Sequence, residues 1–221
     1  DVKFLTPDQV KEIWPLCNTS DLVGAIQHPE DGYIQPADLT QALATGARNR
    51  GAEIYRNTNV VGIKQTKNGW VVETDKGSIE CEHVISCSGN FARQTGKMVG
   101  LEIPVIPVEH QYIVTEPHPE IQKRKKEGLP EMGVLRDSDS RWYMREEAGG
   151  LILGPYEDGA PCCYVDGPSK DSEYELFQED LDRLAPHIEG AIHRVPAFGE
   201  VGVKKVYNGA ICYTPDGNPI V

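Results

Sequence analysis

Residues 82–92, with the sequence EHVISCSGNFA, form a short apolar run that stops at small residues and then turns. Val84 and Ile85 are typical of a strand that is buried on both faces. Ser88 and Gly89 have almost no side chain, so another group can approach their backbone closely. In α/β proteins, ligands bind at such strand ends. The stretch is therefore either an ordinary core strand followed by a turn or a strand that ends at a ligand site.

The composition is that of a globular protein. The chain has 221 residues, 39% hydrophobic and 25% charged, which is enough for one large domain or two smaller ones. A net charge of −12, with one basic run at residues 123–126, argues against a nucleic-acid-binding surface. No apolar segment approaches the ~20 residues that a membrane span needs. The six cysteines form no C-x-x-C pair and show no Cys/His spacing typical of metal ligands. We therefore expect no metal site and a reducing compartment.

The two ends indicate a piece of a longer protein. The chain begins at Asp1 without an initiator methionine and stops at Val221 within an apolar run. It contains no G-x-G-x-x-G motif, so we expect any dinucleotide phosphate loop to lie outside it.

The first half is predicted to be an α/β arrangement that contains a β-meander. Residues 6–9, TPDQ, are typical of a helix start, and Pro15 ends that short helix. Pro36 opens the clearest helix, which Gly51 terminates, and its apolar stripe predicts close packing on a sheet. The stripe consists of Leu39, Ala42, Leu43 and Ala47. The predicted strands cover residues 23–27, 53–56, 60–66, 70–74 and 78–80, followed by the strand at 84–87.

The second half is predicted to be mostly antiparallel sheet with two helices. Strands are expected at 108–115, 134–137, 141–147, 151–156, 201–207 and 210–214, the last two as a hairpin around Asn208-Gly209. Residues 116–132 read as a polar loop, and 172–175 as a capping box whose helix breaks at Pro186. A second short helix is expected to run to residue 196, and residues 214–217 to form a turn. In the strand at 108–115, alternation puts His110 and Tyr112 on the apolar face.

Several motifs, in this order, resemble the D-amino-acid-oxidase-type FAD oxidoreductases. They are DGYIQP at 31–36, GARNRGA at 46–52, the meander opening at Val60 and CSGNFA at 87–92. Further motifs are similar to the dimethylglycine dehydrogenase and sarcosine dehydrogenase branch. They are PVEHQY at 107–112, LRD at 135–137, YMRE at 143–146, GPYE at 154–157 and YTPDG at 213–217. The chain departs from the common pattern at Asn90-Phe91.

The resemblance implies a discontinuous FAD-binding domain with a β-meander and a substrate domain built on an antiparallel sheet. Residues 29–92 would be the middle of the FAD domain and 207–221 the start of its last segment. Residues 1–28 and 93–206 would belong to the substrate domain. The dinucleotide loop, a histidine that bonds FAD covalently, and a tetrahydrofolate-binding region would all lie outside this chain.

The reaction that the resemblance implies is oxidation of the N-methyl group of dimethylglycine or sarcosine by hydride transfer to flavin N5. Such an enzyme would pass its electrons to an electron-transfer flavoprotein. It would be located in the mitochondrial matrix of a eukaryote or the cytoplasm of a bacterium. Two alternatives stay open: an N-methyl amino acid oxidase that uses oxygen, and a non-catalytic module that retains the substrate-domain fold.

Candidate catalytic residues follow from the chemistry of amine oxidation. Only the neutral amine has the lone pair that drives hydride loss, so the site needs a group that accepts a proton near pH 7. By resemblance His110 has this role beside the flavin; the alternative is a neutral core histidine. Tyr143, on the adjacent hairpin, would hydrogen-bond the substrate; the alternative is a buried tyrosine whose hydroxyl is paired.

Binding residues are expected for the substrate and for FAD. A substrate carboxylate would bind a guanidinium or a set of hydroxyls. The candidate guanidinium groups are those of Arg136, Arg141 and Arg145, with Tyr112 and Tyr156 as wall residues. By resemblance, FAD would meet the backbone of Val60 at the adenine and Ser88 and Gly89 at the ribose or pyrophosphate. Near the flavin ring the expected residues are Thr214, Pro215, Asp216 and Gly217.

Overall fold

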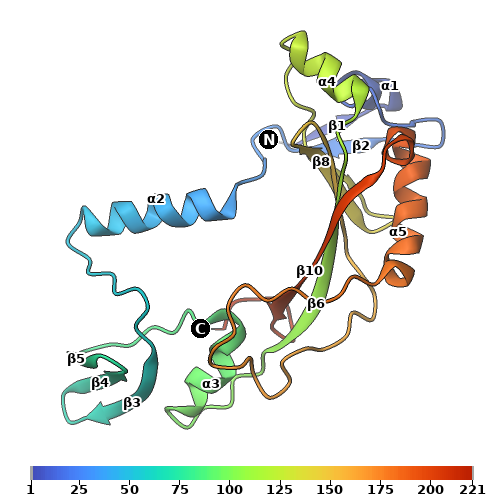
Figure 1. Cartoon of the computed structure of the whole chain (residues 1–221). Helices are drawn as coiled ribbons and strands as arrows, with labels where there is room; N and C mark the ends of the chain where they lie inside the picture. The colour runs from blue at the N-terminus through green and yellow to red at the C-terminus, as the bar shows by residue number, and fades with distance from the viewer. Residues whose placement is uncertain (1, 221) are drawn as a thin grey trace. The chain divides into compact units, whose positions relative to one another are not determined.

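The computed structural model describes residues 2–220 and divides into two compact units. Within the described residues, unit 1 consists of 2–33, 109–161 and 174–209, and unit 2 of 34–108, 162–173 and 210–220. Figure 1 labels the elements along the chain. The predicted class, a mixed α/β fold with several antiparallel sheets, is confirmed. Among the described helices, none combines the length and the apolar character that crossing a bilayer requires.

The main sheet has five strands in the order β10-β6-β9-β8-β7. They are β6 (Ile106–Thr115), β7 (Leu135–Asp137), β8 (Trp142–Glu147), β9 (Gly150–Pro155) and β10 (Val203–Tyr213). The β8–β9 hairpin pairs Trp142 with Pro155 and Tyr143 with Gly154, and β7 adds Arg136 opposite Tyr143. This hairpin and the short strand beside it agree with the sequence prediction.

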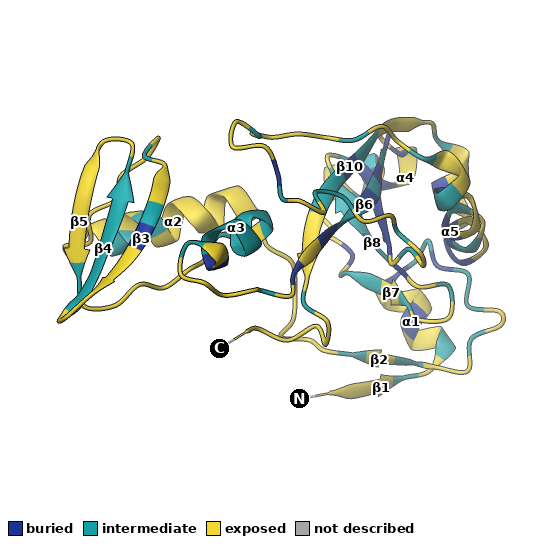
Figure 2. Cartoon of the chain, turned by 90° about the horizontal axis from the view of Figure 1, so that it is seen from below, coloured by how far each residue is buried: buried dark blue, intermediate teal, exposed yellow. Residues whose placement is uncertain are grey.

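One face of this sheet contributes to the core of unit 1. Its fully buried residues include Ile113, Trp142, Met144, Leu151 and Leu153. The helices of the unit are α1 (Pro7–Ile13), α4 (Pro119–Lys126) and α5 (Leu181–Arg194), and β1 (Lys3–Leu5) pairs with β2 (Ala25–Gln27). Helix α5 lies against the core face: its Leu184 and Ala191 belong to the same buried cluster as Trp142, and a Cβ added at Gly190 would lie 3.5 Å from Trp142 Nε1. In Figure 2, buried residues gather on β6, β8 and α5.

Three predictions about helices are wrong. Helix α5 begins at Leu181, where Asp180 accepts a hydrogen bond from the Arg183 N–H, and it continues through Pro186. The proline lies near the N-terminal end of the helix and removes one hydrogen bond there, while buried side chains on the following turns hold the helix against the sheet. The expected capping box at 172–175 starts no helix, and the expected loop at 116–132 contains α4.

The predicted hairpin at Asn208-Gly209 is also wrong, because β10 runs straight through both residues. Neither residue has the positive φ that a two-residue hairpin turn of this type needs. The Asn208 side chain is instead buried and donates hydrogen bonds to Glu109 Oε2 and to the carbonyl of Gln178, both at 2.8 Å. Long-range bonds therefore replace the local turn.

The alternation predicted for the strand at residue 110 is correct, but its two faces are exchanged. Gln111, Ile113 and Thr115 are the buried set, whereas His110 and Tyr112 are only half-buried. The buried side chain of Gln111 is compatible with the core because its polar atoms are hydrogen-bonded to Glu157 and Asp180.

Unit 2 contains the predicted meander and two helices. The meander has the order β3-β4-β5, formed by β3 (Val60–Thr66), β4 (Gly69–Thr74) and β5 (Gly77–Cys81). Helix α2 (Pro36–Arg48) starts at the predicted proline, and the short η1 (Gly89–Phe91) leads into α3 (Ala92–Lys97). Residues 93–108 and 162–173, which the sequence assigns to a substrate domain, lie in this unit.

Three expectations for unit 2 are not met in this structure. Residues 83–88 are not a strand, and Ile85 is 86% exposed. Residues 53–56 are not a strand either, and no residue of α2 is buried. A strand buried on both faces needs neighbouring strands and covering layers, and within residues 2–220 no segment pairs with 83–88. The apolar stripe of α2 is thus left uncovered, as the exposed colouring in Figure 2 shows.

Candidate functional site

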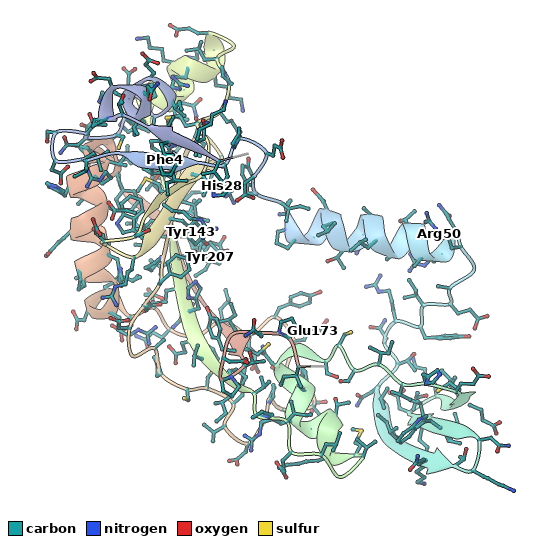
Figure 3. The ribbon with its side chains drawn as sticks, turned by 180° about the vertical axis from the view of Figure 1, so that it is seen from behind. Phe4, His28, Arg50, Tyr143, Glu173 and Tyr207 are labelled. Carbon is teal, nitrogen blue, oxygen red and sulfur yellow. The ribbon has the colours of Figure 1, made fainter. Side chains whose placement is uncertain are left out.

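The face of the main sheet opposite the core carries a group of tyrosines, and we call it the open face. Tyr112 on β6 stacks on Tyr207 of β10, with ring centroids 4.7 Å apart and planes 16° apart. Tyr143 of β8 meets Tyr156, which follows β9, at 6.0 Å and 58°. Figure 3 labels Tyr143 and Tyr207 on this sheet. The open face thus offers aromatic surfaces from four neighbouring parts of the sheet.

His110 lies two residues before Tyr112 on β6, so its side chain projects from the open face. Burial lowers the pKa of His110, and the nearby carboxylate of Glu157 partly opposes this effect. The imidazole is therefore mainly neutral near pH 7 and can accept a proton. Burial raises the pKa of Tyr112, with smaller contributions from Tyr207 and Tyr143, so its hydroxyl stays protonated.

Tyr143 is held against the backbone of the neighbouring strand. Gly154 is its cross-strand partner, and a Cβ atom at residue 154 would overlap with Cε1, Cζ and the hydroxyl of Tyr143. The absence of a side chain at residue 154 therefore lets the tyrosine ring lie over β9. This contact determines where the phenol group lies on the open face.

The three candidate arginines differ in their partners. Arg141 forms an ion pair with Asp158. Arg145 lies 4.2 Å from the centre of the Tyr33 ring and 2.5 Å from a carboxylate oxygen of Glu147.

Arg136 donates a hydrogen bond of 3.0 Å to the hydroxyl of Tyr156, which is neutral. Among the described residues, no carboxylate forms an ion pair with Arg136. Of the three guanidinium groups, it is the one whose charge is not paired with a carboxylate within the described residues.

Three residues of the open face were not predicted from the sequence. Tyr207 and Lys205 lie on β10, where the Lys205 ammonium is 4.5 Å from the Tyr207 ring centre, and Tyr33 lies under Arg145. Lys205 and Tyr207 are two residues apart, a spacing that places both side chains on one face of a strand. The predicted strand at 201–207 contains both residues, but the sequence does not indicate that this strand lies beside β6.

The residues expected at FAD all lie in unit 2. The β3–β4 register shifts between Val60 and Gly62, a bulge of the kind common beside functional sites. Ser88 Oγ is 2.7 Å from Ser86 Oγ and accepts a bond of 2.9 Å from Thr95. Gly89 has φ +55° and open space where a Cβ would lie. These features leave backbone accessible to a nucleotide, so the residues fit the cofactor.

Residues 214–217 form the expected turn. The Gly217 N–H donates to the Thr214 carbonyl at 3.2 Å, and the Thr214 hydroxyl donates to the Asn218 carbonyl at 2.7 Å. Bonds from Asn218, first from its backbone N–H, lower the pKa of Asp216. Pro215 lies at the centre of this exposed turn. The turn is accessible and structured, which also fits a cofactor contact.

Comparisons with known proteins cover the whole chain. Residues 1–221 match the family model described as DAO, FAD dependent oxidoreductase. Mitochondrial dimethylglycine dehydrogenase of Rattus norvegicus is 39% identical over 99% of this chain and 26% of its own length. Mitochondrial sarcosine dehydrogenase of Mus musculus is 34% identical over 98% of this chain and 23% of its own length. The chain thus spans about a quarter of the curated relatives it matches.

A solved structure shows the same architecture. L-proline dehydrogenase from P.horikoshii superimposes with a TM-score of 0.80 at 27% sequence identity. The match covers 99% of this chain and 54% of that chain.

Proposed function

The chain belongs to the DAO family of FAD-dependent oxidoreductases, and we propose that it is part of a dehydrogenase acting on an N-methylated glycine derivative, dimethylglycine or sarcosine. The observation that carries the proposal is the open face: a half-buried histidine with a lowered pKa lies on a sheet face rich in tyrosines. The named relatives act, by their names, on dimethylglycine and sarcosine, which supports this substrate class.

The first chemical task of the site is to make the amine neutral. The substrate arrives as an ammonium ion, whose nitrogen has no free electron pair. His110 accepts the ammonium proton, since its lowered pKa keeps the imidazole neutral near pH 7. FAD, when bound, supplies the hydride acceptor. Loss of hydride from the methyl carbon lets the nitrogen lone pair form a C=N bond, and water or a folate then takes up the iminium product.

The second task is to orient the substrate. Methylated ammonium groups bind well over aromatic ring faces, and Tyr112 offers such a surface, since its stacking partner Tyr207 already carries the Lys205 ammonium. Tyr143 donates a hydrogen bond to the substrate from its fixed position over Gly154. Arg136 binds the carboxylate, because its charge is not neutralised by an ion pair within the described residues. Arg145 and Tyr156 complete the wall around it.

The cofactor contacts and wider assembly belong to the same proposal. Val60, Ser88, Gly89 and residues 214–217 would hold FAD through backbone groups in the FAD-domain segments 29–92 and 207–221. A histidine outside this chain would bond the flavin covalently, and a further region would bind tetrahydrofolate. An electron-transfer flavoprotein accepts the electrons, and in a eukaryote the protein works in the mitochondrial matrix.

The test is anaerobic mixing of the complete protein with a panel of amines. We expect loss of the oxidised-flavin absorbance with dimethylglycine or sarcosine, and little change with dimethylethanolamine, which lacks the carboxylate. Reoxidation by electron-transfer flavoprotein, compared with oxygen, separates a dehydrogenase from an oxidase. A correctly folded protein that contains flavin, but whose flavin no N-methyl amino acid reduces, would leave only the non-catalytic alternative.

A further inference from the structure

A buried carboxylate beside β6 is not used by the proposed chemistry. The side chain of Glu157, just after β9, is only 2% exposed. Its Oε1 accepts the backbone N–H of Gln111 at 2.9 Å, and its Oε2 accepts the Gln111 side-chain amide at 3.0 Å. Oε2 also accepts Arg183 Nε at 2.8 Å. Glu157 therefore holds the residue that directly follows His110.

The need for this carboxylate follows from the strand pairing. The described register of β6 with β9 consists of Ile113 with Leu153 and Val114 with Ile152. Strand β9 ends at Pro155, which has no N–H to donate. A buried backbone N–H such as that of Gln111 needs an acceptor, and Glu157 provides it where the ladder stops.

The same network holds the residue that precedes His110. Arg183 donates to Glu109 Oε2 at 3.2 Å, and Asn208 donates to the same oxygen at 2.8 Å. The Gln111 side chain also exchanges hydrogen bonds with the backbone of Asp180, the N-cap of α5, at 2.8 and 3.2 Å. Both neighbours of His110 in the chain are thus tied to Arg183, on the core side of the sheet.

We propose that Glu157, together with Arg183, is the positioning residue for His110. The pair fixes Glu109 and Gln111, and thereby the direction in which the imidazole projects from the open face. The Glu157 carboxylate also places a buried negative charge near the imidazole. This inference rests on the proposed function of His110 as the proton acceptor. The charged groups in this network are Glu109 on the same strand, Glu157 after β9, Arg183 on α5 and Asp180 at the N-cap of α5.

The first test measures the pH dependence of flavin reduction in the complete protein carrying Glu157→Gln. Glutamine retains the shape and can still accept the Gln111 N–H, but the charge is lost. Without the negative charge the imidazole gives up its proton more readily, so the acid limb should move to lower pH by roughly one pH unit. The maximal rate should fall about tenfold, because the NH2 group of glutamine cannot accept the bonds that Oε2 takes from the Gln111 amide and Arg183 Nε, and the network shifts. Glu157→Asp keeps the charge and should restore the position of the limb, though not the full rate.

A second readout does not depend on turnover. The rate at which diethyl pyrocarbonate modifies His110, followed by mass spectrometry of its peptide, reports the protonation of the imidazole. Its pH midpoint should move to lower pH in Glu157→Gln. As a control, Asp21→Asn removes a carboxylate partner of Arg194 elsewhere in unit 1 and should leave both profiles unchanged.

The two proposals fail in different ways. If no amine reduces the wild-type flavin, the proposed function is wrong, while the modification profile still tests the link between Glu157 and His110. If wild type is active and Glu157→Gln has the wild-type limb and midpoint, the positioning role is wrong and the proposed function stands. If Glu157→Gln does not fold, Glu157→Asp is the deciding variant. Flavin reduction at the full wild-type rate in Glu157→Asp would overturn the inference.

Discussion

Replacing Gly154 with alanine tests the geometry of the open face at its tightest contact. Gly154 is buried on β9 opposite Tyr143, and an added Cβ would overlap with three atoms of the phenol group. The ring would have to move off the strand. We expect Gly154→Ala to destabilise the protein and also to slow flavin reduction, because Tyr143 leaves its position.

The size of the effect follows from the contact. Forcing a methyl group into a packed site costs about 1–3 kcal/mol. For a domain of this size, each kcal/mol lowers the thermal midpoint by about 2–4 °C. Gly133→Ala is the matched control, since a Cβ there would meet nothing within 4 Å, and we expect no measurable loss of stability.

A double-mutant cycle tests whether the overlap with the Tyr143 ring causes the loss of stability in Gly154→Ala. In a Tyr143→Ala background the ring is absent, so Gly154→Ala should cost at most about 0.5 kcal/mol, leaving a coupling energy of about 1–3 kcal/mol. In a Tyr143→Phe background Cε1 and Cζ remain, and most of the cost should persist. Equal costs of Gly154→Ala with and without the ring would refute the reasoning.

Three further predictions use other parts of unit 1. Asn208→Ala removes the bonds to Glu109 and to a backbone carbonyl and should cost about 1–3 kcal/mol in denaturant unfolding; a value near zero would contradict a buried role. Bonds from Arg194, then His193, lower the pKa of Asp21, so this carboxylate stabilises the fold above the ordinary carboxyl pKa of about 4. That contribution is lost as the pH falls further, and Asp21→Asn should flatten the acid side of the stability profile; an unchanged profile would count against the ion pair. Arg136→Gln should raise KM for dimethylglycine about 10–100-fold, because a hydrogen bond between two charged groups is lost. An equal rise in KM for an amine without a carboxylate would exclude carboxylate binding by Arg136.

Elements that depend on local chemistry were predictable from the sequence. The capping box at Thr6 starts α1, and Pro36 starts α2. The turns of the meander and of the β8–β9 hairpin lie where their glycines indicate. In each case the residues that determine the element lie within a few positions of one another, so no distant contact is needed to recognise it.

Elements that depend on distant partners were not predictable. Asn208-Gly209 is a strong turn signal, yet Asn208 lies in a strand because Glu109 and Gln178 bind its side chain. Residues 82–88 have the composition of a buried strand, but pairing strands for it do not occur within residues 2–220.

The same distinction applies to the candidate site. His110 and Tyr143 were recognisable from motifs. Placing Lys205 and Tyr207 required the knowledge that β10 lies beside β6. Finding Glu157 required the knowledge that β6 loses its strand partner at Gln111. A single sequence contains the residue types, but not the register that brings them to one place.

The central claim is that His110 and Tyr143 act on the substrate from the open face. The most direct measurement is the single-turnover rate of flavin reduction in the complete protein carrying His110→Ala or Tyr143→Phe. His193→Ala is the control, since this exposed histidine on α5 pairs with Asp21. We predict that His110→Ala slows reduction at least about 100-fold, that Tyr143→Phe slows it less, and that the control matches wild type. Wild-type rates in both open-face variants would contradict the claim.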